Sequence, residues 1–335
     1  MTTTIAVDVG SGYTKFCIAD GSKNPLRGSI PSIVADVGDR QRVESGFGVS
    51  SPYLIEIDGH TFIVGEDARM LVEKGQRRPT LSNDYALSDQ WLALLLVAIC
   101  ELISEAESSV NVCVALPQAI YQSSPEMRDR LTKRLNDSFS FRLRGMPRTL
   151  KIHAVVAPQA AAVVLDCANR ESGLSEDGVE IGVVDIGTFT TGFGVFMNSR
   201  MFVQRCSGVE AGISGIIDEL GERIRKDYGA SLDTPSLHDI IRHGSFRYRG
   251  KIQDASQMIS ESSARTARTI IAELRKVWPS ADTMDVFIAG GGAPVLASAI
   301  RNEIPHAKVS EEPFWAVVGG LGVYAVQAFK SSGTR

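Results

Sequence analysis

The same short pattern occurs twice in this chain, once near the start of each half. Residues 7–16 read VDVGSGYTKF and residues 184–193 read VDIGTFTTGF. Each copy has an apolar, β-prone run that ends in an aspartate, followed by a glycine, a hydroxyl residue and a turn into a second strand. The copies lie about half the chain apart, which is far longer than a solenoid repeat. The pattern therefore predicts two related domains that each begin with a β-hairpin.

The rest of the sequence alternates predicted strands with predicted helices. This alternation is typical of an α/β fold. The apolar run 91–100 is too short to cross a bilayer and is expected to form a buried helix. The other expected strands are 53–57, 60–64, 110–115, 152–156 and 285–289, and the other expected helices are 126–136, 159–168, 213–225, 257–277, 294–304 and 315–330.

The predicted domain boundaries follow from the repeat. The first domain is expected to contain residues 1–158 and 313–335, and the second to contain residues 159–312. Two stretches with short strands or polar turns, about 36–86 and about 228–256, are expected to be inserts. A chain of 335 residues is long enough for two domains of ordinary size.

Composition excludes several classes of protein. The chain is 44% hydrophobic and 22% charged with a net charge of −4, so neither a DNA-binding nor a membrane-binding surface is expected. The five cysteines form no CxxC pair, which predicts free thiols and a cytoplasmic location. A strand is expected almost at once, at Ile5, and no signal peptide or anchor is expected before it.

The first repeated turn has the residues of a phosphate-binding loop. Gly10 and Gly12 permit a tight turn whose backbone N–H groups can approach an anion, and hydroxyl residues and Lys15 flank it. Asp8 would repel phosphate unless a hydrated Mg²⁺ lay between them. For one copy alone, an ordinary hairpin remains the alternative. The second copy repeats the chemistry with Asp185, and two such hairpins could hold a triphosphate between two domains.

Five segments, in this order along the chain, resemble the actin superfamily. They match its two phosphate loops, its two interdomain connectors and its adenosine motif. The segments are 8–15, 157–162, 184–191, 287–293 and 318–322. The resemblance implies two actin-like, RNase H-like domains with a nucleotide cleft between them.

The resemblance also implies roles for individual residues. Asp8 and Asp185 would hold Mg²⁺ through water, Gln159 would orient the attacking water, and Asp185 would assist the departure of its proton. Gln can position water without acting as a strong base, which predicts slow hydrolysis. Glu219 would contact the ribose, with a solvated helix face as the alternative. The implied phosphate and adenosine contacts are Ser11, Gly12, Tyr13, Thr14, Lys15, Gly187, Thr188, Phe189, Thr190, Gly290, Gly291, Gly292 and Ala293.

Two shorter segments, 64–68 and 114–121, resemble ParM/StbA plasmid-segregation proteins and their archaeal relatives. ParM-type proteins often carry Glu at the position of Gln159, so this residue departs from that subtype. The resemblance implies an ATPase that forms filaments with itself for plasmid partition, with a DNA-bound adaptor as partner. ATP and GTP both remain candidates for the nucleotide. A monomeric phosphotransferase of the sugar-kinase branch and a nucleotide sensor without hydrolysis are the alternatives.

Overall fold

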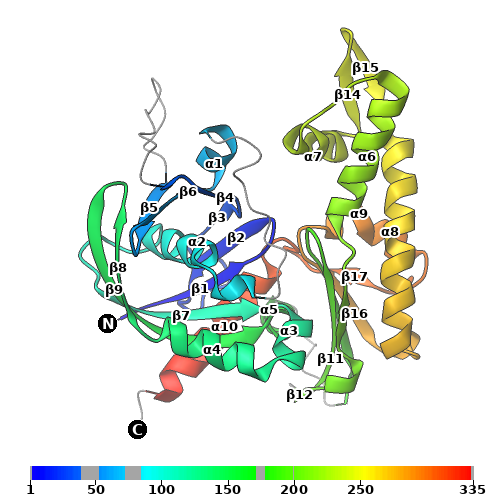
Figure 1. The fold of residues 1–335 in the computed structure, drawn as a ribbon. Helices are drawn as coiled ribbons and strands as arrows, with labels where there is room; N and C mark the ends of the chain where they lie inside the picture. Colours follow the sequence, from blue (N-terminus) through cyan, green and yellow to red (C-terminus); the bar gives the residue numbers. More distant parts are fainter. Residues whose placement is uncertain (1, 39–52, 72–83, 171–177, 199, 333–335) are drawn as a thin grey trace. The chain divides into compact units, whose positions relative to one another are not determined.

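The structure is a computed structural model, and it describes residues 2–38, 53–71, 84–170, 178–198 and 200–332 (Figure 1). Contacts within the chain define two compact units. Unit 1 contains residues 1–172 and 315–335, and unit 2 contains residues 173–314. Both units have a mixed β-sheet with helices, which confirms the predicted α/β class.

Unit 1 is built on a nine-stranded sheet with the order β3-β2-β1-β7-β9-β8-β5-β6-β4. Strand β1 pairs with β2 in antiparallel and with β7 in parallel orientation, and the central strand β7 is largely buried. The strands are β1 Thr3–Val9, β2 Tyr13–Ile18, β3 Arg27–Pro31, β4 Val34–Asp36, β5 Tyr53–Ile57, β6 His60–Val64, β7 Ser109–Leu116, β8 Ser138–Leu143 and β9 Met146–Pro158.

One helix of unit 1, α2 (Asp89–Cys100), fills the core under this sheet. All residues from Trp91 to Ile99 are buried, as expected for a helix that is apolar on every side. The Ser88 side chain accepts a hydrogen bond from the Trp91 N–H and caps the helix start. The other helices of unit 1 are α1 Glu66–Leu71, η3 Tyr85–Leu87, α3 Gln118–Ser123, α4 Pro125–Leu135, α5 Gln159–Arg170 and α10 Ala316–Ser332.

Helices α5 and α10 pack against each other at very short range. A Cβ on Gly320 of α10 would overlap the carbonyl oxygen of Ala162 of α5, so this contact requires glycine. The packing places α5 in unit 1, whereas the sequence analysis began the second domain at residue 159. The predicted boundary therefore stays a prediction, about one helix away from the division by contacts.

Unit 2 repeats the central motif of unit 1 in its six-stranded sheet, ordered β12-β11-β10-β16-β17 with β13 beside β11. Strand β10 pairs with β11 in antiparallel and with β16 in parallel orientation, as β1 does with β2 and β7. The repeated sequence pattern is therefore also a repeated topology. The strands are β10 Ile181–Ile186, β11 Thr191–Met197, β12 Arg200–Met201, β13 Ser207–Val209, β16 Asp285–Ala289 and β17 Lys308–Val309.

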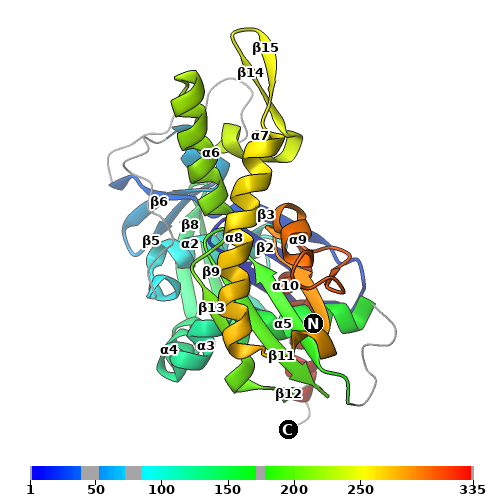
Figure 2. The ribbon, with the colours of Figure 1, turned by 90° about the vertical axis from the view of Figure 1, so that its right-hand side faces the viewer.

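The helices of unit 2 include the long neighbours α6 (Ile213–Tyr228) and α8 (Ser256–Val277), which lie side by side (Figures 1 and 2). The hairpin of β14 (Ser245–Tyr248) and β15 (Lys251–Asp254) projects beyond the ends of these helices. The remaining elements are α7 Thr234–His243, α9 Ala293–Arg301, η4 Val203–Arg205 and η5 Ala281–Thr283.

Among the described residues, none of the helices is long and apolar enough to cross a bilayer. All five cysteines are free thiols, as predicted. Much of the first predicted insert, at 39–52 and 72–83, lies outside the described residues.

Candidate functional site

The first repeated turn connects β1 to β2 through residues 10–12. Asp8 and Lys15 are direct partners across the two strands, so the register places them side by side. A Cβ on Gly10 would lie 2.9 Å from the Tyr13 carbonyl oxygen, and the Ser32 N–H donates to the Gly12 carbonyl at 2.9 Å. The turn is therefore tight, needs glycine at position 10, and is held in place by the chain that follows β3.

Asp8 lies at the centre of a small polar network in unit 1. Its side chain is only 2% exposed; Lys15 Nζ lies 2.9 Å from Oδ2, and Gln159 Nε2 donates to Oδ1 at 2.9 Å. Gln159 is the first residue of α5. The structure thus joins three of the predicted site residues, although Gln159 is separated from Asp8 by more than 150 positions.

Thr14, predicted to contact phosphate, is fully buried. Its hydroxyl lies 2.9 Å from the hydroxyl of Ser32, so these two side chains satisfy each other. Ser32 was not predicted from the sequence, and it belongs to none of the motifs. The predicted phosphate contacts of Ser11, Gly12, Tyr13 and Thr14 stay predictions.

The second repeated turn, between β10 and β11, has the same tight form. The Gly187 N–H donates to the Thr190 carbonyl at 2.8 Å, and a Cβ on Gly187 would lie 2.9 Å from that oxygen. Thr191 is buried and donates its hydroxyl hydrogen to the Ala211 carbonyl at 2.6 Å. Asp185 lies two residues before Gly187, as Asp8 lies two residues before Gly10 in unit 1.

Backbone groups of α6 hold the second turn from one side. The Ser214 N–H donates to the Thr188 carbonyl at 2.8 Å, and the Ile213 N–H donates to the Gly187 carbonyl at 3.3 Å. A Cβ on Gly212 would lie 2.5 Å from the Thr188 carbonyl oxygen. Gly212 is thus a residue that the site requires and that the sequence analysis did not predict.

The predicted adenosine motif lies against Asp185 in the same unit. Gly290 has a positive φ of 87°, and its N–H donates to the Pro313 carbonyl at 2.8 Å. A Cβ there would overlap the Ile186 carbonyl oxygen and lie 2.6 Å from Asp185 Oδ1. The Gly292 N–H donates to the Ile186 carbonyl at 2.9 Å. The structure therefore brings the second hairpin and the 290–293 turn together.

Glu219 of α6, the predicted ribose contact, forms an ion pair with Arg265 of α8. Arg265 Nε lies 3.1 Å from Oε2, and this guanidinium lowers the pKa of Glu219 below its ordinary value. This ion pair was not predicted from the sequence. The ribose contact stays a prediction.

Magnesium suits the carboxylates of these hairpins. Within the described ranges, no three His, Cys, Asp or Glu side chains are grouped to form a metal cage. Asp8 already accepts from Lys15 and Gln159, but each carboxylate oxygen has a second lone pair for a water molecule. Mg²⁺ keeps most of its waters and needs few direct carboxylate ligands. The Asp8 carboxylate is therefore compatible with a magnesium ion held through water, and the role predicted for Asp8 together with Asp185 stays a prediction.

Two family models match the sequence. The N-terminal domain of actin-like proteins matches residues 6–161, and the C-terminal domain of the archaeal MreB-like actin homologue matches residues 183–302. The chain is an actin-like protein. Each family model covers one of the two repeated hairpins, and no curated protein sequence matches significantly.

Solved structures of actin-like proteins share the fold over the full length of the chain. The archaeal actin homologue Ta0583, in complex with ADP, has a TM-score of 0.78 at 18% identity, with 97% of this chain and 100% of that chain covered. A ParM from a 15-stranded filament of Clostridium botulinum has a TM-score of 0.77 at 19% identity, covering 97% and 99%. Bacillus thuringiensis ParM with ATP has a TM-score of 0.66 at 14% identity, covering 98% and 99%.

Proposed function

We propose that this actin-like protein is a slow ATPase that assembles into nucleotide-dependent filaments. The observation that supports this most directly is the polar network of Asp8, Lys15 and Gln159 at the first repeated turn. The network joins a cation, a carboxylate and a side-chain amide at one end of a tight, glycine-dependent loop. These groups suit phosphoryl transfer to water, in which catalysis consists of positioning and charge stabilisation.

In the proposed mechanism, each side chain of the network has one task. Gln159 donates its Nε2–H to Asp8, so its Oε1 can accept a hydrogen bond from the attacking water and orient it. Lys15 moves from Asp8 toward the phosphates when the nucleotide binds, which neutralises their charge. Asp185 then accepts the proton of the water, directly or through another water molecule. Without a strong base, turnover is slow.

Magnesium would be held through water by Asp8 and Asp185. When bound, it would supply positive charge to the phosphates. Gly187 to Thr190 would contact the phosphates from the second unit, and Gly290 to Ala293 would let the backbone approach the adenosine. GTP remains an alternative nucleotide, because a backbone cradle discriminates weakly between bases.

Filament formation would follow from nucleotide binding. If ATP binds one arrangement of the two units better than another, it shifts the population toward that arrangement. Copies in the favoured arrangement would add head to tail, and such contacts form open filaments. Hydrolysis would weaken the contacts. We propose plasmid or other DNA segregation in the cytoplasm as the role, with a DNA-bound adaptor protein as the partner.

The test compares light scattering and phosphate release with ATP, with ADP and without nucleotide. We expect polymer and slow phosphate release with Mg-ATP, and neither with EDTA. Asp185→Ala should abolish hydrolysis, with Asp282→Ala, an exposed aspartate in unit 2, as the matched control. No polymer under any condition, together with ATP consumption that depends on a small hydroxylated substrate, would support the sugar-kinase alternative instead. Unchanged activity in Asp185→Ala would support the sensor.

A further inference from the structure

We propose that the hairpin of β14 and β15 in unit 2 binds duplex DNA, chiefly through its phosphates, by entering the major groove. The hairpin projects beyond the ends of α6 and α8 (Figures 1 and 2). It is an antiparallel pair of strands, and the major groove admits a two-stranded β-ribbon. This inference does not depend on the proposed function, because it uses neither of the repeated turns.

Positive charge is concentrated in and beside this hairpin. Residues 240–253 include three arginines and one lysine but neither aspartate nor glutamate, whereas the whole chain has a net charge of −4. For this reason, whole-chain composition predicted no DNA-binding surface. The cations of the hairpin itself are Arg247, Arg249 and Lys251, and all three are exposed. Contacts between such cations and phosphates supply most of the affinity of non-specific DNA binding.

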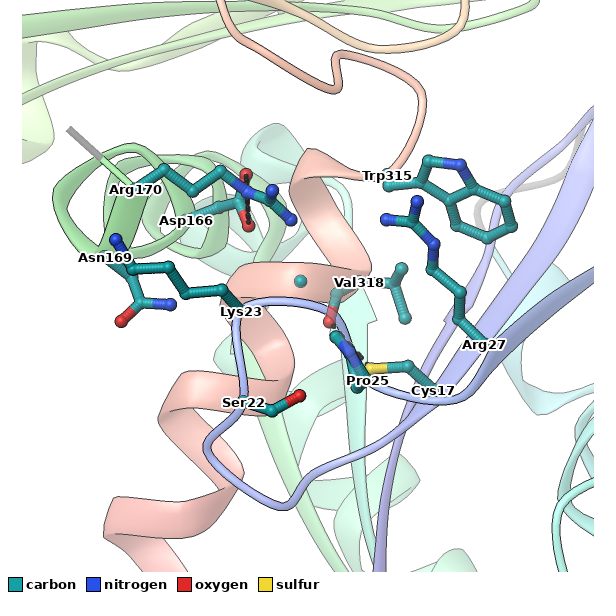
Figure 3. Close-up of a pocket in the computed structure, with 11 residues that line it drawn as sticks. Cys17, Ser22, Lys23, Pro25, Arg27, Asp166, Asn169, Arg170, Trp315 and Val318 are labelled. Carbon is teal, nitrogen blue, oxygen red and sulfur yellow. Dashed lines mark hydrogen bonds and ion pairs between the residues drawn. The ribbon is translucent and has the colours of Figure 1, made fainter.

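The cations of the hairpin differ from arginines that are held by a carboxylate of their own unit. Figure 3 shows such a case in unit 1, where Arg170 Nε lies 3.0 Å from both oxygens of the buried Asp166. Among the residues that the structure describes, no ion pair is formed by Arg247, Arg249 or Lys251. Their charges are therefore not neutralised by a carboxylate of the described chain.

Cations lie on both faces of the ribbon and at its turn. Direct partners across two antiparallel strands share a face, so Arg247 lies on the face of Ile252, and Lys251 lies on the opposite face with Tyr248. Arg249 lies in the turn between the strands. A flat acidic protein surface would meet the cations of one face, whereas a groove has phosphates along both of its walls. The arrangement therefore favours DNA over an acidic protein.

Aromatic side chains hold the hairpin in position. The rings of Phe246 and Tyr248 each lie 5.1 Å from the ring of Tyr228, near the end of α6. The Tyr248 hydroxyl also donates to the Tyr228 carbonyl at 2.6 Å. Because a lone two-stranded hairpin is marginally stable in water, this packing lets the ribbon project as an ordered element.

The turn holds an arginine in a conformation that arginine rarely adopts. Arg249 has a φ of 45°, and Gly250 follows it with a φ of 80°. Hairpin turns of two residues with positive φ favour Asn-Gly or Asp-Gly, and other residues are strained there. The chain thus places a cation at the projecting turn against the local preference of the backbone.

The outer face of the ribbon carries an exposed apolar side chain. Ile252 is 73% exposed, the highest value among the large apolar side chains of the described residues. It is the direct cross-strand partner of Arg247. In the major groove, an apolar side chain can contact the methyl group of thymine. The major groove of duplex RNA is too deep and narrow for this, so the ribbon fits DNA.

The test is a fluorescence-anisotropy titration of a labelled DNA duplex of about 20 base pairs with the full chain, without nucleotide, so that no filament adds avidity. Three phosphate contacts predict a slope of about −3 for the logarithm of affinity against that of salt concentration. Arg247→Gln and Lys251→Gln should each weaken binding about tenfold in low salt and reduce the slope by about one. Arg268→Gln, an exposed cation on α8 of the same unit, is the matched control and should bind as the unmodified chain does.

Two further variants separate binding from folding. Arg249→Asn removes the charge but suits the positive φ, so it should weaken binding about tenfold without loss of stability in urea unfolding. Ile252→Ala should weaken binding about threefold and leave the salt slope unchanged, because it removes apolar surface and no charge.

Three outcomes would overturn the proposal. The first is absence of salt-dependent binding, and the second is an equal loss of affinity in Arg268→Gln. The third is an equal affinity for poly-glutamate, which would assign the hairpin to an acidic protein partner. Equal affinity for duplex RNA, or unchanged affinity in Ile252→Ala, would contradict entry into the major groove.

Discussion

The two repeated turns have the same topology, but different parts of the chain hold them in place. In unit 1, side chains surround the aspartate, since Asp8 is buried against Lys15 and Gln159. In unit 2, backbone lies close to the aspartate, since a Cβ on Gly290 would lie 2.6 Å from Asp185 Oδ1, and the α6 N–H groups bind the carbonyls of the turn. Both turns therefore need their first glycine, Gly10 or Gly187, but side chains contact the aspartate of the first turn and glycine backbone lies against the aspartate of the second.

This difference determines which substitutions each turn can tolerate. A change in the first turn should alter chemistry more than folding, because Lys15 and Gln159 can be replaced without filling occupied space. A substitution of Gly212 or Gly290 beside the second turn should alter folding more than chemistry, because a Cβ has no room there. Substitutions at both turns test this contrast, with expected effects that range from a large loss of stability to a small one.

Gly290→Ala should cause the largest loss of stability. The residue has a φ of 87°, and the added Cβ would overlap the Ile186 carbonyl oxygen. Strain at positive φ and overpacking each cost about 1–3 kcal/mol, so a loss of about 3 kcal/mol or more is expected. Urea unfolding monitored by circular dichroism measures the change.

Gly250→Ala is the matched control for this substitution. Gly250 also has a positive φ, of 80°, but nothing lies within 4 Å of the position that an added Cβ would take. Only the backbone strain remains, and a loss of about 1 kcal/mol is expected. Equal losses of stability in the two variants would show that the close approach of Gly290 to the second turn does not add to the cost of the substitution.

Among substitutions of the residues that contact Asp8 at the first turn, Gln159→Ala should cause the largest loss of activity. The variant removes the amide that Asp8 holds in place, and with it the proposed orientation of water. We expect kcat for ATP hydrolysis to fall about a hundredfold, while ATP affinity changes by less than about threefold. Single-turnover kinetics and calorimetry separate the two effects.

The control for Gln159→Ala is Gln257→Ala. Gln257 also donates to a carboxylate, Glu261, at 3.0 Å, but it does so on the exposed surface of α8. Its kcat should equal that of the unmodified chain. A hundredfold loss of ATP affinity in Gln159→Ala would assign Gln159 to binding and remove the proposed role in hydrolysis.

Much of the fold was predictable because local patterns coincide with tertiary structure. Strands β5, β6 and β16 begin and end where the sequence predicts, and the apolar run 91–100 forms the buried helix α2. Strand β9 is an exception: its predicted part is short, but it extends to Met146 because its first half pairs with β8. The alternating sequence of β8, SFSFRL, could have indicated this hairpin.

The site was predictable only in its motifs. Both Asp-Gly turns are visible in the sequence, but the contacts of Gln159 with Asp8 and of Thr14 with Ser32 join distant positions. No local pattern specifies such pairs. Ser256 directly precedes the predicted helix 257–277, where a serine would be expected to cap it, but the cap position is Ala255 and Ser256 lies in the helix. The Ser256 N–H instead donates to Oδ1 of Asp254, just upstream of the helix, at 2.9 Å.

Thr14→Val and Thr191→Val test the contrast at equivalent positions, each the buried threonine that follows its turn. Both should lose about 1–2 kcal/mol of stability, because each leaves a buried oxygen without its hydrogen bond. The first loss should be recovered in the double variant Thr14→Val with Ser32→Ala, since the partner is a side chain. No side-chain change can recover the second, whose partner is the Ala211 carbonyl. Failure of the double variant to regain stability in urea unfolding would contradict the side-chain account of unit 1.

Glu219→Gln should have the smallest effect on the stability of the folded chain. The pair with Arg265 lies at the surface, where ion pairs contribute about 0.5 kcal/mol or less. Because Arg265 lowers the pKa of Glu219 in the folded chain, the pair stabilises at neutral pH, and this contribution disappears as the pH falls through the lowered pKa. The stability difference between Glu219→Gln and the unmodified chain, measured by urea unfolding, should therefore shrink in acid. ATP affinity gives the second measurement. If the Glu219 side chain also contacts the ribose, Glu219→Ala should weaken ATP binding more than Arg265→Ala does. Nucleotide binding by unit 2 would then also depend on a side chain.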